Sequence, residues 1–244
     1  SPLSMTTTSS TLSQPQENEF QTGQVLPIAG AHFIHDVFTS FFPPLLPALI
    51  EKLSLSLAQV GSLNAILQIG SLLNPLLGYL ADKINMRYFV IFAPAVTATL
   101  MSLIGVTSSY YSLAAILFIT GFSVAAFHAP APAMIGRVAG RKIGLGMSIF
   151  MASGEMSRTV GPLLAVWAAS LWGLEGVARM MVLGWAASLI LFWRLRGVSA
   201  RLSRPGSLRS VLPIMVSFFL PLAVVNFLRN FLAECLTTYL PTYL

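Results

Sequence analysis

Two pairs of ionisable residues interrupt otherwise apolar stretches of this sequence. His32 and Asp36 are four residues apart, and Glu155 and Arg158 are three apart, so each pair would share one face of a helix. An imidazole beside a carboxylate can hold and release a proton, and a guanidinium can bind an anion through two hydrogen bonds. Such groups are costly in the middle of a bilayer unless they are paired or hydrated, so their presence there indicates a function.

Asp36 is the residue that we predict to take up a coupling proton, helped by His32 or His35. It lies about 11 residues, or roughly 16 Å, into its apolar stretch, which is near the middle of a membrane. Glu155 lies at a similar depth in a later stretch and is a further proton-coupling candidate. A poorly hydrated carboxylate holds its proton tightly and a nearby histidine cation opposes this, so we expect proton exchange near neutral pH. The alternative is a structural hydrogen bond within a kinked helix.

Substrate binding is predicted at Arg158, His128 and Asp36. Arg158 would hold an anionic substrate such as a carboxylate or phosphonate. In the alternative, Arg158 and Glu155 form an ion pair that lets both enter the bilayer. His128 precedes Pro130 and would either line the same cavity or bond a backbone carbonyl that the proline leaves free.

The sequence carries no catalytic or metal-binding constellation around these residues. His32 and His35 are two histidines without a third soft ligand close in sequence, so we predict no metal site and no cofactor. The single cysteine, Cys235, cannot form an internal disulfide. Nucleophile–base spacing and a phosphate-binding loop are both missing, which argues against an enzyme.

Membrane-spanning helices must hold the ionisable residues in place. The chain is 55% apolar and only 9% charged, whereas a soluble domain carries roughly 25% charged residues. Residues 23–193 are predicted to form a bundle of six helices. The six predicted spans are residues 25–50, 60–80, 88–107, 110–135, 143–171 and 177–193. Three prolines at positions 43, 44 and 47 are expected to kink or unwind the second half of the first span.

Further segments flank this bundle on both sides. Residues 1–22 are rich in Ser, Thr and Gln and lack Lys and Arg, so we predict a disordered cytoplasmic tail. Residues 194–210 form a basic linker, and residues 211–244 begin a second bundle with a seventh helix. Because 34 residues of helix would measure about 51 Å, we expect this last segment to start at the membrane surface or to bend at Pro213 or Pro221.

The loop cations predict the orientation of the bundle. Ten of them fall on one side of the predicted membrane and two on the other. The larger group is Lys83, Arg87, Arg137, Arg141, Lys142, Arg194, Arg196, Arg201, Arg204 and Arg209, and the smaller is Lys52 and Arg179. The positive-inside rule then places the N-terminus in the cytoplasm. Since the cations sit in short loops between apolar spans, they account for the net charge of +6 without a nucleic-acid partner.

A short loop between the second and third spans resembles the signature loop of the major facilitator superfamily. Gly78, Asp82, Lys83 and Arg87 stand at or near its key positions, whereas Asn85 replaces its second glycine. The resemblance implies that Asp82 holds the inner helix ends together in the outward-facing state. The alternative for this loop is a solvated turn.

Motifs in every predicted helix except the third and sixth resemble those of the fosmidomycin-resistance group of efflux transporters within that superfamily. The residues that carry this resemblance are His32-x-x-His35-Asp36, Phe-Pro43-Pro44-Leu-Leu-Pro47, Ala-Ala-Phe-His128, Gly161-Pro162-Leu-Leu and residues 236–244. Residues 33–46 also match residues 231–244 at an offset of 198, as expected of two parallel six-helix halves. The resemblance implies a major facilitator fold of twelve helices, alternating access and proton-driven export of small molecules, including antibiotics. The remaining five helices would come from the rest of the protein.

Three functions stay open at this point. In the favoured one, the protein is a multi-pass antiporter of the bacterial inner membrane. Its partners are then the lipid bilayer, protons and a small-molecule substrate. The second is a proton-coupled importer of an organic anion. The third is a membrane receptor of the same fold that transports nothing, which substrate-dependent proton flux in vesicles would distinguish from the other two.

Overall fold

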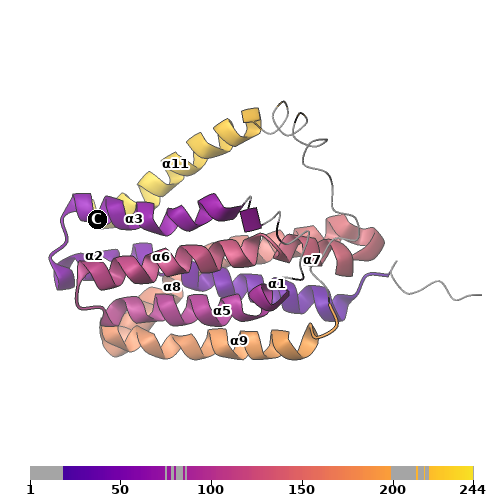
Figure 1. The fold of residues 1–244 in the computed structure, drawn as a ribbon. Coiled ribbons are helices and arrows are strands. Elements are labelled where there is room, and N and C mark those ends of the chain that lie inside the picture. Colours follow the sequence, from indigo (N-terminus) through magenta and orange to yellow (C-terminus); the bar gives the residue numbers. More distant parts are fainter. Residues whose placement is uncertain are drawn as a thin grey trace, which may run out of the picture.

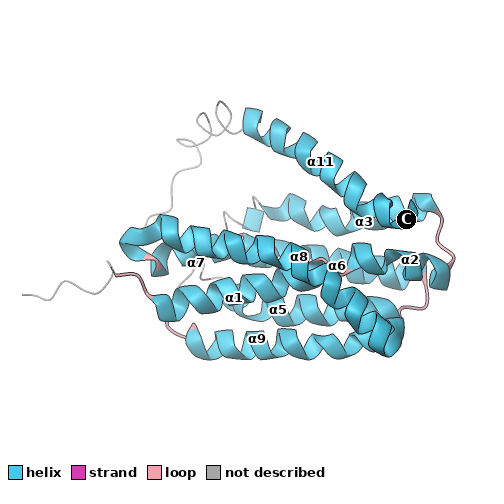
Figure 2. Cartoon of the chain, turned by 180° about the vertical axis from the view of Figure 1, so that it is seen from behind, coloured by secondary structure: helices cyan, strands magenta, loops and turns pink. Residues whose placement is uncertain are grey.

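Helices are the regular secondary structure of the described part of the chain. The computed structural model describes residues 19–74, 76–77, 80, 85, 87–198, 213, 217 and 220–243, and these contain no strand (Figure 2). This confirms the predicted all-α class. The predicted tail (residues 1–22) and linker (194–210) fall mostly outside the described residues, so their boundaries stay predictions.

The helices run back and forth along one long axis, and a further helix crosses this bundle obliquely (Figure 1). The passes are α1 (Thr22–Thr39) with α2 (Phe42–Leu53), α3 (Leu57–Ile69) with η1 (Gly70–Leu73), α5 (Arg87–Ser102) with η2 (Leu103–Val106), α6 (Tyr110–His128) with α7 (Ala131–Val138), η3 (Gly140–Lys142) with α8 (Ile143–Gly176), and η4 (Val177–Met180) with α9 (Met181–Arg194). The crossing helix is α11 (Leu220–Tyr243), which packs against α2. Its 24 residues measure about 36 Å, enough for one crossing of a bilayer.

Four stretches of described helix, counted across short breaks, are long and apolar enough to cross a membrane. They are Thr22–Leu53, Arg87–Val106, Tyr110–Val138 and Gly140–Arg194, and α3 is a shorter apolar helix. The last stretch contains the fifth and sixth predicted spans, because the chain is helical on both sides of the turn at Gly173. Gly173 has a φ of +71°, which a residue without a Cβ adopts at no steric cost.

The first pass breaks at Ser40–Phe41, directly before Pro43 and Pro44. Proline has no N–H with which to continue the hydrogen bonding of α1, so the break follows from the sequence. The Asp36 carbonyl accepts hydrogen bonds from the backbone N–H of Ser40 at 3.2 Å and from its hydroxyl at 2.8 Å. The second half of the pass is a regular helix and is not unwound. Its partner in the sequence repeat, α11, is continuous through the matching positions.

Two apolar clusters fill the bundle and leave a polar layer between them. Along α1, Ile28 belongs to one cluster and Val37 to the other. His32, His35 and Asp36 lie between these residues and are all buried. The fold therefore places the ionisable groups of the first pass in the middle of the bundle, on the face of α1 that meets the other helices.

Candidate functional site

Three side chains from two helices meet in the polar layer. α1 carries His32 and Asp36, and the last residue of α6 is His128. His128 Nε2 lies 3.0 Å from Asp36 Oδ1, and His32 Nε2 lies 3.2 Å from Asp36 Oδ2. Each oxygen of the Asp36 carboxyl group thus faces one histidine nitrogen. We call these three residues the His–Asp–His cluster.

The ring of His32 is fixed from three directions. Its Nδ1 donates a hydrogen bond of 2.7 Å to the Phe150 carbonyl, and the ring stacks on Phe150 with centroids 3.9 Å apart. Gly154 lies against the ring edge, where an added Cβ would overlap the imidazole. Both Phe150 and Gly154 belong to α8, so the packing of α1 on α8 sets the orientation of His32.

This orientation determines where a proton sits in the cluster. A carbonyl oxygen only accepts, so His32 Nδ1 must carry a hydrogen. In a neutral ring, Nε2 then presents a lone pair toward Asp36 Oδ2, and two such acceptors repel each other. The contact at 3.2 Å is attractive only with a proton between the two atoms, either on the imidazole or on the carboxyl group. The geometry therefore fits a cluster that holds one proton more than a neutral histidine and a carboxylate do.

His128 completes the cluster from the other side. The break between α6 and α7 at Ala129–Pro130 leaves its half-buried ring at the end of α6. The ring points to Asp36, so His128 contacts the carboxyl group and not a backbone carbonyl freed by the proline. No local pattern in the sequence predicts this contact, because 92 residues separate the two side chains.

His35 is buried beside the cluster without joining it. Its ring stacks on Phe127 with centroids 4.5 Å apart, and it meets the His128 ring edge to face at 5.5 Å. Neither ring nitrogen has a hydrogen-bond partner in the structure. Of the two histidines proposed to assist Asp36, only His32 contacts its carboxyl group.

The His–Asp–His cluster also brings together three atoms that are able to bind a transition metal. These ligand atoms all lie within 4.8 Å of one another. Sequence spacing does not indicate this group of ligands, because His128 lies 92 residues from Asp36. The observed separations of 3.0 and 3.2 Å are hydrogen-bond distances, so the arrangement fits a shared proton. The absence of a metal site stays a prediction.

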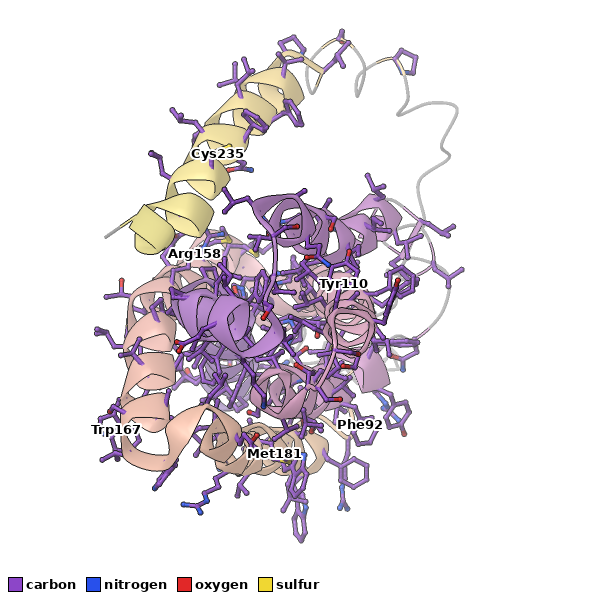
Figure 3. All side chains as sticks on the ribbon, turned by 90° about the vertical axis from the view of Figure 1, so that its left-hand side faces the viewer. Phe92, Tyr110, Arg158, Trp167, Met181 and Cys235 are labelled. Atoms are coloured by element: carbon purple, nitrogen blue, oxygen red, sulfur yellow. The ribbon has the colours of Figure 1, made fainter. Side chains whose placement is uncertain are left out.

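A cavity of about 580 Å³ opens next to the cluster. Asp36 and His128 line it together with Arg158 from α8. The other lining residues are Thr39, Ser40, Pro43, Pro44, Leu67, Gln68, Gly121, Val124, Pro162, Leu236 and Thr237. Figure 3 shows Arg158 on the side of the bundle that faces α11, whereas Phe92 and Met181 lie on the opposite side. The two predicted chemistries, proton exchange and anion binding, thus share one cavity.

Glu155 lies outside this arrangement. Its carboxylate is 4.0 Å from Arg158 Nε, and the two side chains are 64% and 67% exposed. Arg158 lines the cavity and Glu155 does not. Both the ion pair and the cavity position are therefore present at Arg158, while Glu155 has only the ion pair.

Most of the predicted signature loop lies outside the described residues. Gly78, Asp82 and Lys83 belong to this group, so their predicted role stays untested. Arg87 is the first residue of α5. Its guanidinium donates hydrogen bonds to the Tyr88 hydroxyl and to the Arg196 carbonyl.

Comparison with known proteins gives one family and two curated relatives. A sequence model of the Major Facilitator Superfamily matches residues 28–244. The Fosmidomycin resistance protein of Escherichia coli (strain K12) is 32% identical over 178 residues, which cover 71% of this chain and 43% of that protein. The uncharacterized MFS-type transporter YfnC of Bacillus subtilis (strain 168) is 25% identical over 172 residues, or 64% of this chain and 42% of that protein. The chain thus spans less than half the length of the curated relatives that it matches.

Proposed function

Because the chain belongs to the Major Facilitator Superfamily, we propose that the whole protein is a secondary transporter that exports small molecules in exchange for protons by alternating access. The similarity to a fosmidomycin resistance protein supports efflux as the direction. The His–Asp–His cluster and the adjoining cavity support the coupling, because a proton site and a substrate-sized space lie side by side. The proposal extends to helices beyond this chain, which would form the other wall of the cavity.

One observation carries the proposal more than any other. The Phe150 carbonyl holds the hydrogen of His32 on Nδ1, so the contact between His32 Nε2 and Asp36 Oδ2 needs a proton. Release of that proton leaves two acceptors of α1 facing each other, which destabilises the orientation in which the His32 ring is held against α8. Gain and loss of one proton would thereby shift the equilibrium between two packings of the bundle, as alternating access requires.

Arg158 is the proposed anion-binding residue of the cavity. Its guanidinium is permanently charged and matches a carboxylate or phosphonate with two parallel hydrogen bonds. His128 also lines the cavity and would donate to the same anion once its contact with Asp36 is released. Fosmidomycin is the first substrate to test, because a relative is named for resistance to it.

The shared cavity also favours a second candidate function, namely proton-coupled import of an organic anion. A protonated Asp36 is neutral, and an anion at Arg158 meets less repulsion beside a neutral group than beside a carboxylate. Binding of proton and anion would then be mutually favourable, which is the requirement for movement in the same direction. Antiport requires the opposite, since the substrate must displace the proton.

Transport by the full-length protein in proteoliposomes tests both candidates. A proton gradient is imposed, substrate movement is followed, and the internal pH is read with a trapped dye. Antiport predicts that substrate entering vesicles drives protons out, and symport predicts that both move inward. The variant Asp36→Asn should abolish the dependence on the gradient. Glu175 is an exposed carboxylate at the C-terminal end of α8, and Glu175→Gln should preserve that dependence. Gradient-driven transport that survives unchanged in Asp36→Asn refutes the proposed proton site.

The proposed location is the bacterial inner membrane, with the N-terminus in the cytoplasm. The family and the bacterial relatives support an integral membrane protein, and the loop cations support the orientation. Single cysteines placed at Ser109 and Arg141, in a protein whose Cys235 is replaced by serine, should react with a membrane-impermeant maleimide from opposite faces. Labelling of Arg141→Cys from outside intact cells would contradict the proposed orientation and indicate the opposite one.

A further inference from the structure

Two arginines line a pocket at the end of the bundle where α5 begins and α9 ends. The pocket holds about 340 Å³ and is lined by Arg87, Tyr88, Ile91, Phe192 and Arg196. α5 and α9 lie on the side of the bundle away from α11 (Figure 1). This pocket therefore opens on a different face from the cavity of the His–Asp–His cluster.

The positive charge of this pocket has no counter-charge among the described residues. Arg87 lies over the Tyr88 ring at 4.8 Å and donates to the Tyr88 hydroxyl at 3.0 Å, while its Nε is buried without a partner. Arg196 lies over the rings of Phe192 at 4.9 Å and Trp193 at 5.1 Å, and it is exposed. No carboxylate is among the lining residues. Two guanidinium groups held on aromatic rings form a site for an anion with several oxygens.

An apolar groove adjoins this pocket and shares one residue with it. The groove holds about 440 Å³ between α5 and α6, and Tyr88 lines both spaces. Its other lining residues are Leu77, Phe89, Phe92, Ala93, Val96, Ile119, Phe122, Ser123 and Ala126. Phe89, Phe92 and Phe122 are exposed large side chains. A charged pocket that shares the wall residue Tyr88 with an apolar groove matches a molecule with an anionic head and a hydrocarbon tail.

We propose that this composite site binds one anionic phospholipid, with its phosphate between Arg87 and Arg196 and an acyl chain along the groove. Arginines near aromatic residues at a helix end are typical of the headgroup level of a membrane, where they attract anionic lipids. A free phosphate would use the two arginines and leave the groove empty. The groove therefore favours the lipid, and the site does not depend on the direction of transport.

Binding of a fluorescent phosphatidylglycerol to the purified full-length protein in neutral detergent tests the proposal. Arg196→Gln should weaken binding about fivefold, because each arginine near an anionic lipid surface contributes about that factor. Arg87→Gln should also weaken binding about fivefold, because it removes the second guanidinium group of the pocket. Arg179→Gln is the matched control, because Arg179 is also exposed and stacks on an aromatic ring, Trp172, at the opposite end of the bundle.

Two further measurements separate the lipid from other occupants. Phosphatidylcholine of the same chain length should compete at least about fivefold more weakly than phosphatidylglycerol, and inorganic phosphate at millimolar concentration should not compete. Equal competition by phosphatidylcholine, displacement by inorganic phosphate, or equal binding by Arg196→Gln and Arg179→Gln each overturns the proposal. Since Arg196 is exposed, its substitution is expected to leave folding intact, and Arg196→Gln alone decides the outcome should Arg87→Gln fail to fold.

Discussion

The two ionisable pairs of this protein have nearly the same spacing and very different surroundings. His32 and Asp36 lie in the core, with the ring of His32 fixed by Phe150 and Gly154. Glu155 and Arg158 are about two-thirds exposed, and only the arginine lines the cavity. Helical spacing thus predicts that two side chains share a face, and the packing of the helix decides whether that face is a core or a cavity wall.

Because the two pairs differ in burial, we expect them to have different roles. A group fixed in the core from several sides can change the balance between two packings when it gains or loses a proton. A group on a cavity wall can bind and release a ligand without repacking the helices. The predictions below test this division, from the largest expected effect to the smallest.

His32→Leu should lower proton-driven transport at least about 100-fold, because it removes one partner of the shared proton. It should also lower the free energy of unfolding by about 1–3 kcal/mol, since Asp36 loses a buried hydrogen-bond partner. Transport in proteoliposomes and thermal unfolding in detergent measure the two effects. The control is Thr97→Val, which breaks the buried Thr97–Ser123 hydrogen bond between α5 and α6 and should affect stability alone. Transport by His32→Leu at the level of this control would contradict the proton site.

Gly154→Ala should disturb His32 without removing it. The added Cβ overlaps the imidazole, so the ring must leave its place between Phe150 and Asp36. We expect a transport rate about tenfold lower and a loss of about 1–3 kcal/mol in stability. Gly144→Ala is a matched control, because an added Cβ there meets nothing within 4 Å. Equal transport by the two variants would show that the orientation of His32 is unimportant.

Arg158→Lys should raise the apparent KM for an anionic substrate about tenfold, because lysine cannot form the two parallel hydrogen bonds. Stability should change little, since the side chain is exposed and its ion pair at 4.0 Å is weak. The KM of Glu155→Gln, measured in the same way, separates a structural ion pair from a role in the cavity. A purely structural ion pair predicts the same effect from both variants, whereas a cavity role predicts a change in KM for Arg158→Lys alone.

Glu175→Gln tests a surface pair that takes no part in either chemistry. Lys52 donates a hydrogen bond of 2.9 Å to Glu175 and lowers the pKa of that carboxyl group. Because the pKa is lower in the folded state, the pair stabilises the fold above the ordinary pKa of a glutamate. That contribution disappears as the pH falls through the lowered value. We expect a slightly lower Tm than the wild type at neutral pH and no difference in strong acid, with Glu51→Gln as the control. A difference that persists in acid would contradict this assignment.

Much of the fold could be predicted from local patterns in the sequence. The break at Ser40–Phe41 follows from Pro43 and Pro44, which lack the N–H that a continuous helix needs. Ser56 and Ser109 begin α3 and α6 through reciprocal bonds with Gln59 and Ser112. α11 begins at Leu220, next to Pro221. Most of residues 211–219 lie outside the described part of the chain, so the expected surface segment or bend there stays a prediction.

The sequence by itself determined the class of the protein, the order of its apolar helices and the residues that share a helical face, because these depend on composition and on a period of 3.6 residues. Only the tertiary structure brought His128 to Asp36, directed the Phe150 carbonyl to His32 and placed Arg158, but not Glu155, on the cavity wall. Contacts of this kind join residues about a hundred positions apart. They depend on how whole helices pack against one another, which no local period encodes.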